Sequence, residues 1–138
     1  PMDFRTPTEI GKKVDYNFEQ IKNATGYDHN WCLNTYKNGK GDDKTVCASL
    51  YSPKSGILLE VFTNEPGIQV YTGNFQGTGI SCKHGIKYPK HVSVCFESQK
   101  YPDSPTKISQ GVKDWTDATL KPGEKYYSHL AYKFSVKK

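Results

Sequence analysis

Short runs in which apolar and polar residues alternate, each bounded by Gly, Pro, Asn or Asp, recur along the chain. In "HVSVCFESQ", residues 91–99, apolar side chains occupy every second position and small or polar ones lie between them. This period of two is that of a half-buried β-strand, whose successive side chains point to opposite faces. Hairpin-sized spacings separate these runs. We therefore predict about six strands, at 30–34, 45–51, 57–64, 68–74, 91–99 and 125–136.

Helical patterns are scarce, and one short helical turn is expected, at 8–13. The predicted connections are a turn at 38–43, a Gly-rich loop at 75–89 and a long segment with three prolines at 100–124. Aromatic residues, which favour strands, make up 13% of the 138 residues. A chain of this length can form one domain with a core. The expected fold class is all-β, as an antiparallel sheet or sandwich.

The charge pattern is that of a solvated surface. The net charge is +5, the lysines are scattered along the chain, and Arg5 is the only arginine. A nucleic-acid-binding protein more often gathers its basic residues in a stripe that includes arginine. No apolar run approaches the roughly 20 residues of a membrane span. We expect no nucleic-acid or membrane partner. Without a targeting segment in these residues we expect a cytoplasmic protein, with a periplasmic or secreted full-length form as the alternative.

The four cysteines, at 32, 47, 82 and 95, form no C-x-x-C pair, and no His/Cys cluster has the spacing of zinc ligands. Cys32, Cys47 and Cys95 lie in strand-like stretches with apolar neighbours, and we interpret them as reduced packing residues. Disulfides are the alternative, since the number is even. The sequence predicts no metal site.

Three polar residues on separate predicted elements are candidates for a site. Glu97 lies among small and neutral side chains on one strand face, where a partly shielded carboxylate suits a general base. Gln69 offers a donor and an acceptor beside the aromatic ring of Tyr71, as sugar hydroxyls require. Asp28 follows Gly26 and can accept hydrogen bonds from ligand hydroxyls. The alternatives are an exposed strand carboxylate, a solvent-facing glutamine and an Asx turn.

Four motifs connect these residues: "GYDHNWCLN", "LEVFTNEPGIQVYTGNF", "KYPKHVSVCFESQKYPDSP" and "LKPGEKYYSHLAYKFSV". In this order they resemble the galactose mutarotases (aldose 1-epimerases), as the C-terminal part of the family's single antiparallel β-sandwich domain. The resemblance implies that the chain is roughly the C-terminal half of that domain, with 1–25 as a connecting segment and 26–138 as the motif-bearing strands. It implies an enzyme that interconverts the α and β anomers of hexoses such as galactose and glucose. It also implies Glu97 as catalytic base, Asp28 and Gln69 as sugar-binding residues, and no cofactor or metal.

The chain departs from the family pattern in two places. The family's general acid is a histidine in the first part of the enzyme, and none of His29, His84, His91 and His129 matches its motif. Together with the start at Pro1, this leads us to expect a chain that needs the N-terminal half or another chain for activity. Residues 106–119 are also longer than the family's usual segment. The alternatives to a mutarotase are a non-catalytic carbohydrate-binding β-sandwich and a purely structural half.

Overall fold

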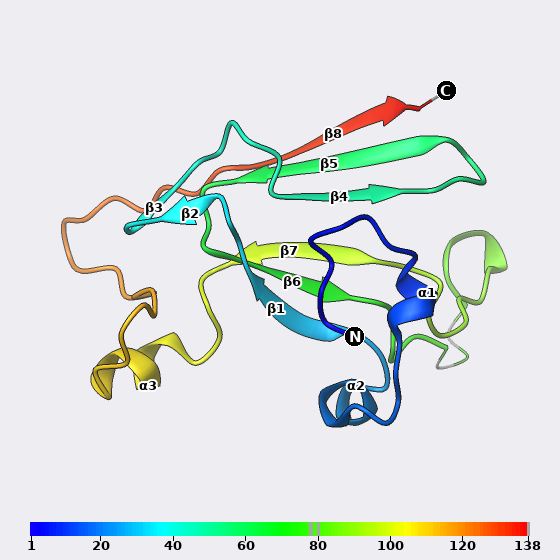
Figure 1. Ribbon diagram of the computed structural model, residues 1–138, viewed down its shortest axis with the longest axis horizontal. Coiled ribbons are helices and arrows are strands. Elements are labelled where there is room, and N and C mark those ends of the chain that lie inside the picture. Colours follow the sequence, from blue (N-terminus) through cyan, green and yellow to red (C-terminus); the bar gives the residue numbers. More distant parts are fainter. Residues whose placement is uncertain (78, 80, 138) are drawn as a thin grey trace. The chain divides into compact units, whose positions relative to one another are not determined.

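The computed structural model of the chain describes residues 1–77, 79 and 81–137 (Figure 1). The helices in this part of the chain are α1 (Ile10–Lys13), α2 (Glu19–Ala24), α3 (Ser104–Ser109) and the 3-10 turn η1 (Lys83–Gly85). Its strands are β1 (Asp28–Cys32), β2 (Tyr36–Lys37), β3 (Lys40–Gly41), β4 (Ala48–Tyr51), β5 (Ile57–Thr63), β6 (Gly67–Tyr71), β7 (Cys95–Gln99) and β8 (Leu130–Val136). The predicted helical turn and the predominance of strands are confirmed.

The strands form three sheets with the orders β1-β6-β7, β2-β3 and β4-β5-β8. The pairs β2–β3, β4–β5 and β5–β8 are antiparallel. In Figure 1, β6 runs opposite to its neighbours β1 and β7. Antiparallel sheets need only short connections, which matches the hairpin-sized spacing of the sequence. The turn between β2 and β3 has Asn38 and Gly39 at positive φ (52° and 77°), as the tight two-residue hairpin turn requires.

The chain divides into two compact units, each described here by itself. The first comprises Pro1–His29 and Gln69–Glu97, and the second comprises Asn30–Ile68 and Ser98–Lys138. Asp28, Gln69 and Glu97 all belong to the first unit.

The core of the first unit lies where α2 meets the start of β1. Ile21 of α2 is fully buried, and Tyr27 is 1% exposed. The Tyr27 ring packs edge-on against Phe4, with 5.3 Å between ring centroids, and its hydroxyl donates to the Pro1 carbonyl. The N-terminal residues therefore pack on this core.

The core of the second unit is small and partly polar. Its buried apolar side chains include Val61, Ile68, Leu33 and Pro66. A buried carboxylate also lies here, because Glu65 is 3% exposed and its Oε2 is 2.8 Å from Lys100 Nζ. The two side chains form an ion pair rather than a well-aligned hydrogen bond.

Two α-helices of the described residues, α2 and α3, were not predicted, because each is too short to show a helical period. α2 has six residues and buries one of them, Ile21. It ends at Thr25, which adopts the left-handed conformation common after helix ends. α3 begins with Ser104 and places Pro105 in its first turn, where a missing N–H costs nothing. The long connection at 100–124 is therefore partly helical.

Several predicted strand ends were also wrong. β7 begins at Cys95 rather than at 91, and His91 has φ 60°, which an extended strand does not allow. β8 begins at Leu130 rather than at 125, because Leu130 pairs with Thr63, the last residue of β5. β1 begins two residues before the predicted start. Of the predicted Gly-rich loop, Thr78 and Ile80 lie outside the described residues.

Candidate functional site

Asp28 and Gln69 lie side by side on β1 and β6. Gln69 Nε2 donates a hydrogen bond of 2.7 Å to Asp28 Oδ1, although the two residues are 41 positions apart in sequence. Both side chains are half-buried. The Gln69 Oε1 atom is buried and has no hydrogen-bond partner among the described residues. The pair therefore holds unused acceptors, which are what the hydroxyl donors of a sugar require.

A buried polar network holds the chain just before Asp28 against the end of β6. Asn74 is fully buried, and its Nδ2 donates to the carbonyl oxygens of Ala24 (2.9 Å) and Tyr27 (2.8 Å). Its Oδ1 accepts from the Thr72 hydroxyl at 2.7 Å, and Thr72 Oγ1 in turn accepts from the Tyr27 N–H. Every side-chain group of this network has a partner, which makes it a specific clamp. It sets the position of Asp28 relative to Gln69.

Glycine is required at position 26 because both the backbone conformation and the packing there exclude a side chain. Its φ is 146°, a backbone conformation that residues with a Cβ rarely adopt. A Cβ on Gly26 would also lie only 2.3 Å from Asn74 Oδ1. The absence of a side chain lets the turn after α2 approach the Asn74 amide closely enough for its hydrogen bonds.

Glu97 lies at the centre of β7 and is exposed. The shielding from water that the sequence led us to expect is absent, since its neighbours in the first unit leave the carboxylate open to solvent. No ion pair or hydrogen bond involves this side chain within the part of the chain that the structure describes. Its geometry is therefore set by the backbone of β7 rather than by side-chain partners.

The orientation of Glu97 follows from a contact further along the same strands. Gln99 Nε2 donates to Asn30 Oδ1 at 3.5 Å, so these two side chains share one face of the sheet. Residues two apart on a strand point to the same face. Glu97 therefore lies on the face of Gln99, and Asp28 on the face of Asn30. By this alternation the carboxylate of Glu97 shares a face with the Asp28–Gln69 pair.

The histidines lie apart from this arrangement or make other contacts. His29 Nδ1 is 3.0 Å from the Asp28 backbone nitrogen, and His91 Nδ1 is 3.3 Å from the Thr72 carbonyl oxygen. In the second unit, His129 Nδ1 is 3.3 Å from Asp43 Oδ2. Among the described residues, no group of three or more His, Cys, Asp or Glu side chains is placed to hold a metal ion.

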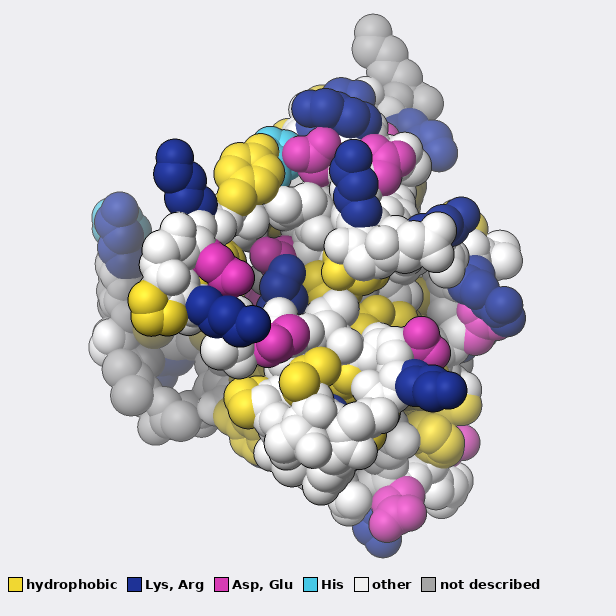
Figure 2. Space-filling model, turned by 90° about the vertical axis from the view of Figure 1, so that its left-hand side faces the viewer, with side chains coloured by type: hydrophobic (Ala, Val, Ile, Leu, Met, Phe, Trp, Pro, Cys, Tyr) yellow, Lys and Arg dark blue, Asp and Glu magenta, His cyan; other side chains and the backbone are white. Residues whose placement is uncertain are grey.

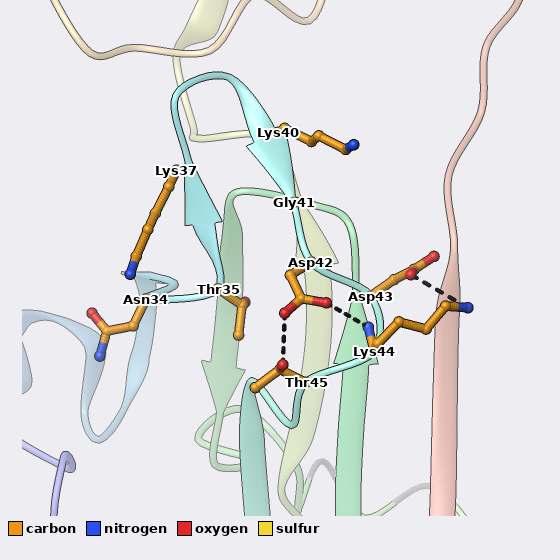
Figure 3. A pocket seen from close by; sticks show the side chains of 9 residues that line it. All are labelled: Asn34, Thr35, Lys37, Lys40, Gly41, Asp42, Asp43, Lys44 and Thr45. Carbon is orange, nitrogen blue, oxygen red and sulfur yellow. Dashed lines mark hydrogen bonds and ion pairs between the residues drawn. The ribbon is translucent and has the colours of Figure 1, made fainter.

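Two hollows in the described part of the chain contain none of the three predicted site residues. One of about 660 Å³ surrounds the β2–β3 hairpin (Figure 3), with a lining of Asn34, Thr35, Lys37, Lys40, Gly41, Asp42, Asp43, Lys44 and Thr45. Asp42 accepts from the Thr45 hydroxyl (2.6 Å) and the Lys44 N–H (2.9 Å), and these bonds hold its pKa below the usual value. Its carboxylate thus serves the turn rather than a ligand.

The surface around this hairpin carries charges of both signs. On the face in Figure 2, Lys and Arg side chains are interspersed with Asp and Glu. Lys44 Nζ, for example, lies 3.6 Å from Asp43 Oδ1. This is the surface expected from the scattered lysines. None of the helices within the described residues is long and apolar enough to span a membrane.

The cysteines differ in their environment. Cys47 is half-buried, its thiol donates to the Val61 carbonyl oxygen at 3.2 Å, and burial raises its pKa. Cys95 is also half-buried, but Cys32 is exposed. The interpretation of Cys32 as a packing residue was therefore wrong.

Comparison with known proteins decides the family. Residues 1–133 match the family model described as aldose 1-epimerase. The chain belongs to the aldose 1-epimerase family. It is 40% identical over 135 residues to the galactose mutarotase of Mus musculus and 39% identical over 134 residues to that of Homo sapiens. It is 34% identical over 134 residues to the aldose 1-epimerase of Escherichia coli.

These matches cover nearly all of this chain but only about a third of each relative. The mouse and human matches cover 97% of this chain but 35% of the relatives, and the bacterial match covers 96% and 36%. The chain thus spans about a third of the length of the curated relatives it matches, a smaller share than the half expected from the motifs. A solved GalM/aldose epimerase homologue from C. elegans matches with a TM-score of 0.63 and 25% identity, over 81% of this chain and 30% of that one. The predicted fold class is confirmed.

Proposed function

We propose that this chain forms the C-terminal part of a single-domain aldose 1-epimerase that interconverts the α and β anomers of hexoses such as galactose and glucose. The main support for this proposal is the Asp28–Gln69 hydrogen bond of 2.7 Å. Strand alternation assigns Glu97 to the same face of the sheet. Residues 1–25 connect to the motif-bearing strands of 26–138 in this proposal. The thiols of Cys32, Cys47 and Cys95, none of which forms a disulfide in the structure, favour a cytoplasmic protein.

The reaction needs a base at the hydroxyl of the anomeric carbon and an acid at the ring oxygen. In the proposed mechanism Glu97, as a carboxylate, accepts the proton of the hydroxyl on the anomeric carbon C1. The C1–oxygen bond of the ring breaks as C1 becomes an aldehyde carbonyl, and the ring oxygen takes a proton from the acid. Rotation about the C1–C2 bond presents the other carbonyl face. The ring then closes with the proton transfers reversed.

Asp28 and Gln69 hold the sugar during ring opening. The unused oxygen of Asp28 and the unpaired Oε1 of Gln69 are acceptors for two hydroxyl donors. An open-chain aldehyde that left the site would lose the orientation needed for ring closure, so holding the hydroxyl groups raises the effective concentration of the reacting atoms. The buried network of Asn74 and Thr72 supports this role, because it holds the backbone next to Asp28.

The acid is proposed to come from outside these 138 residues, either from the N-terminal part of the domain or from another chain. A surface feature supports such a partner. On β8 the side chains of Leu130, Tyr132, Phe134 and Val136 share one face and are all exposed, Phe134 by 68% and Val136 by 71%. A contiguous exposed apolar face of this kind marks an interaction surface. We propose that the remainder of the domain covers it.

Polarimetry on freshly dissolved α-galactose tests the proposal. The chain alone is expected to accelerate mutarotation weakly or not at all, and co-expression with its upstream segment is expected to restore the activity. Glu97→Gln, which keeps the size of the side chain but removes the base, should then abolish turnover. Full activity of the 138 residues alone would contradict the need for a partner. Full activity of the Glu97→Gln variant would contradict the assigned base.

A non-catalytic carbohydrate-binding module is the second candidate, and the exposure of Glu97 without a polar partner favours it. The same substitution separates the two functions. A binding module tolerates Glu97→Gln and shows no acceleration of mutarotation with or without the upstream segment. A mutarotase loses turnover on this substitution and retains much of its affinity for galactose in isothermal titration calorimetry.

A further inference from the structure

Two amide side chains meet across the middle strand of the β1-β6-β7 sheet. Asn30 comes from β1 and Gln99 from β7, and the hydrogen bond between them is 3.5 Å long. Both side chains are half-buried. Side chains on the two outer strands of a three-stranded sheet are separated by the middle strand, so a direct contact between them needs a gap in the side-chain layer.

Gly67 of β6 provides this gap. The residue is buried, and a Cβ built on it would lie 2.4 Å from Asn30 Oδ1 and 2.9 Å from Asn30 Nδ2. Those distances are far below van der Waals contact, so the Asn30 amide lies directly over the Gly67 backbone. Any larger residue at position 67 would displace the amide and break its contact with Gln99.

The bridge lies one strand repeat from the proposed site. Asn30 is two residues after Asp28 on β1, and Gln99 is two residues after Glu97 on β7. The Asp28–Gln69 bond fixes one side of the site, whereas Glu97 has no polar side-chain partner among the described residues. The position of the base therefore depends on how β7 is held relative to β1. Both strands are hydrogen-bonded to β6, and the bridge adds a direct side-chain contact between them.

We propose that Asn30 and Gln99, meeting over Gly67, are positioning residues that set the separation between the base Glu97 and the sugar-holding Asp28. This inference rests on the proposed function. Its physical basis is that a proton transfer tolerates little displacement, since a shift of about 1 Å can cost on the order of a hundredfold in rate. Neither amide is assigned a contact with the sugar.

The test compares variants of the protein co-expressed with its upstream segment. Asn30→Leu keeps the size and shape of the side chain but removes the acceptor, whereas Asn30→Asp keeps an acceptor oxygen. Gln99→Ala removes the donor, and Gly67→Ala closes the gap. Matched controls are Gln110→Ala, an exposed glutamine, and Gly11→Ala, where an added Cβ meets nothing within 4 Å. Polarimetry supplies kcat and KM for galactose, and differential scanning calorimetry supplies Tm.

For Asn30→Leu and Gln99→Ala we expect kcat to fall about ten- to a hundredfold. KM should stay within about twofold, because the sugar-holding pair is untouched. Asn30→Asp should recover most of kcat, and both controls should match the wild type. A Gly67→Ala variant that fails to fold leaves the other three decisive, since their side chains are only half-buried.

Three outcomes would overturn the inference: an unchanged kcat in Gln99→Ala, a loss in KM alone, or equal kcat losses in Asn30→Leu and Asn30→Asp. A loss of kcat that follows a loss of Tm would also overturn it, because this would indicate a merely structural role. If the wild-type protein itself fails to accelerate mutarotation, the proposed function fails and the inference falls with it. An active wild type with equally active variants refutes the positioning role alone.

Discussion

Replacing Asn74 tests whether the buried network holds the segment before Asp28 in place. Asn74→Ala removes three hydrogen bonds, from Nδ2 to the Ala24 and Tyr27 carbonyl oxygens and from the Thr72 hydroxyl to Oδ1. At a net value of about 1 kcal/mol for each bond, the expected loss is about 3 kcal/mol of the free energy of unfolding. The Tyr27 carbonyl keeps the Thr72 N–H as a donor at 3.1 Å, so its further penalty is small. Such a loss is a large share of the 5–15 kcal/mol typical of a domain.

Asn74→Asp is the sharper perturbation because it preserves the shape of the side chain. It keeps an acceptor for Thr72 but points a second oxygen at two carbonyl oxygens 2.8 and 2.9 Å from the present nitrogen. A buried charge without a partner costs about 3–5 kcal/mol. Burial raises the pKa of the introduced carboxyl in the folded state above its unfolded value. The destabilisation should therefore be largest above the folded pKa and shrink as the pH falls below it.

The assay is urea-induced unfolding followed by circular dichroism at pH 4 and pH 7. The matched controls are Asn34→Ala and Asn34→Asp, at an exposed asparagine, with an expected change within about 0.5 kcal/mol. A loss below about 1 kcal/mol in Asn74→Ala, or an Asn74→Asp variant as stable as the wild type at pH 7, would refute the view that this amide clamps the segment before Asp28.

Two further predictions concern the second unit. Lys100→Met leaves the buried Glu65 carboxylate without its cation and should cost about 2–3 kcal/mol of the free energy of unfolding in urea. This is below the roughly 3–5 kcal/mol of a fully buried pair because Lys100 is 34% exposed. Glu65→Gln in the same background should recover part of the loss, and no recovery would contradict the ion pair. Burial, together with the Cys32 thiol, raises the pKa of Tyr101 from 10.0 to about 12. The neutral phenol therefore stabilises the fold below pH 10, and this stability is lost as the pH rises from 10 to 12. Tyr101→Phe should reduce the fall in Tm across that range, and an unchanged fall would contradict the assignment.

The strands with regular alternation and strong turn residues were predictable from the sequence. β5 was expected at 57–64 and occupies Ile57–Thr63, and the turn at 38–43 contains the Asn38–Gly39 hairpin. In both places local propensity and tertiary packing favour the same structure. α2 and α3 escaped prediction because six residues are too few to show a helical period. Strand ends depend on the partner strand, which no local pattern contains.

The site was only partly predictable for the same reason. Asp28, Gln69 and Glu97 were singled out from residue type and from the family motifs, but their relation depends on contacts between positions 41 or more apart in the sequence. Thr72 and Asn74 appeared in the sequence as the end of the predicted strand 68–74, with no sign that they hold the segment before Asp28. The exposure of Glu97 was missed, because alternation predicts which face a residue occupies and not what covers that face.

The unpaired Oε1 of Gln69 has a consequence for selectivity among sugars. The amide makes one strong hydrogen bond to Asp28 and leaves a buried acceptor without a partner among the described residues, which is unfavourable. The free energy needed to turn this amide toward a ligand is therefore smaller than for an amide whose donor and acceptor are both hydrogen-bonded. Under the proposed function, a hexose whose hydroxyl donates to this oxygen relieves the penalty, whereas a deoxy sugar without that hydroxyl leaves it in place. Discrimination against deoxy sugars would then arise from the unsatisfied acceptor of Gln69.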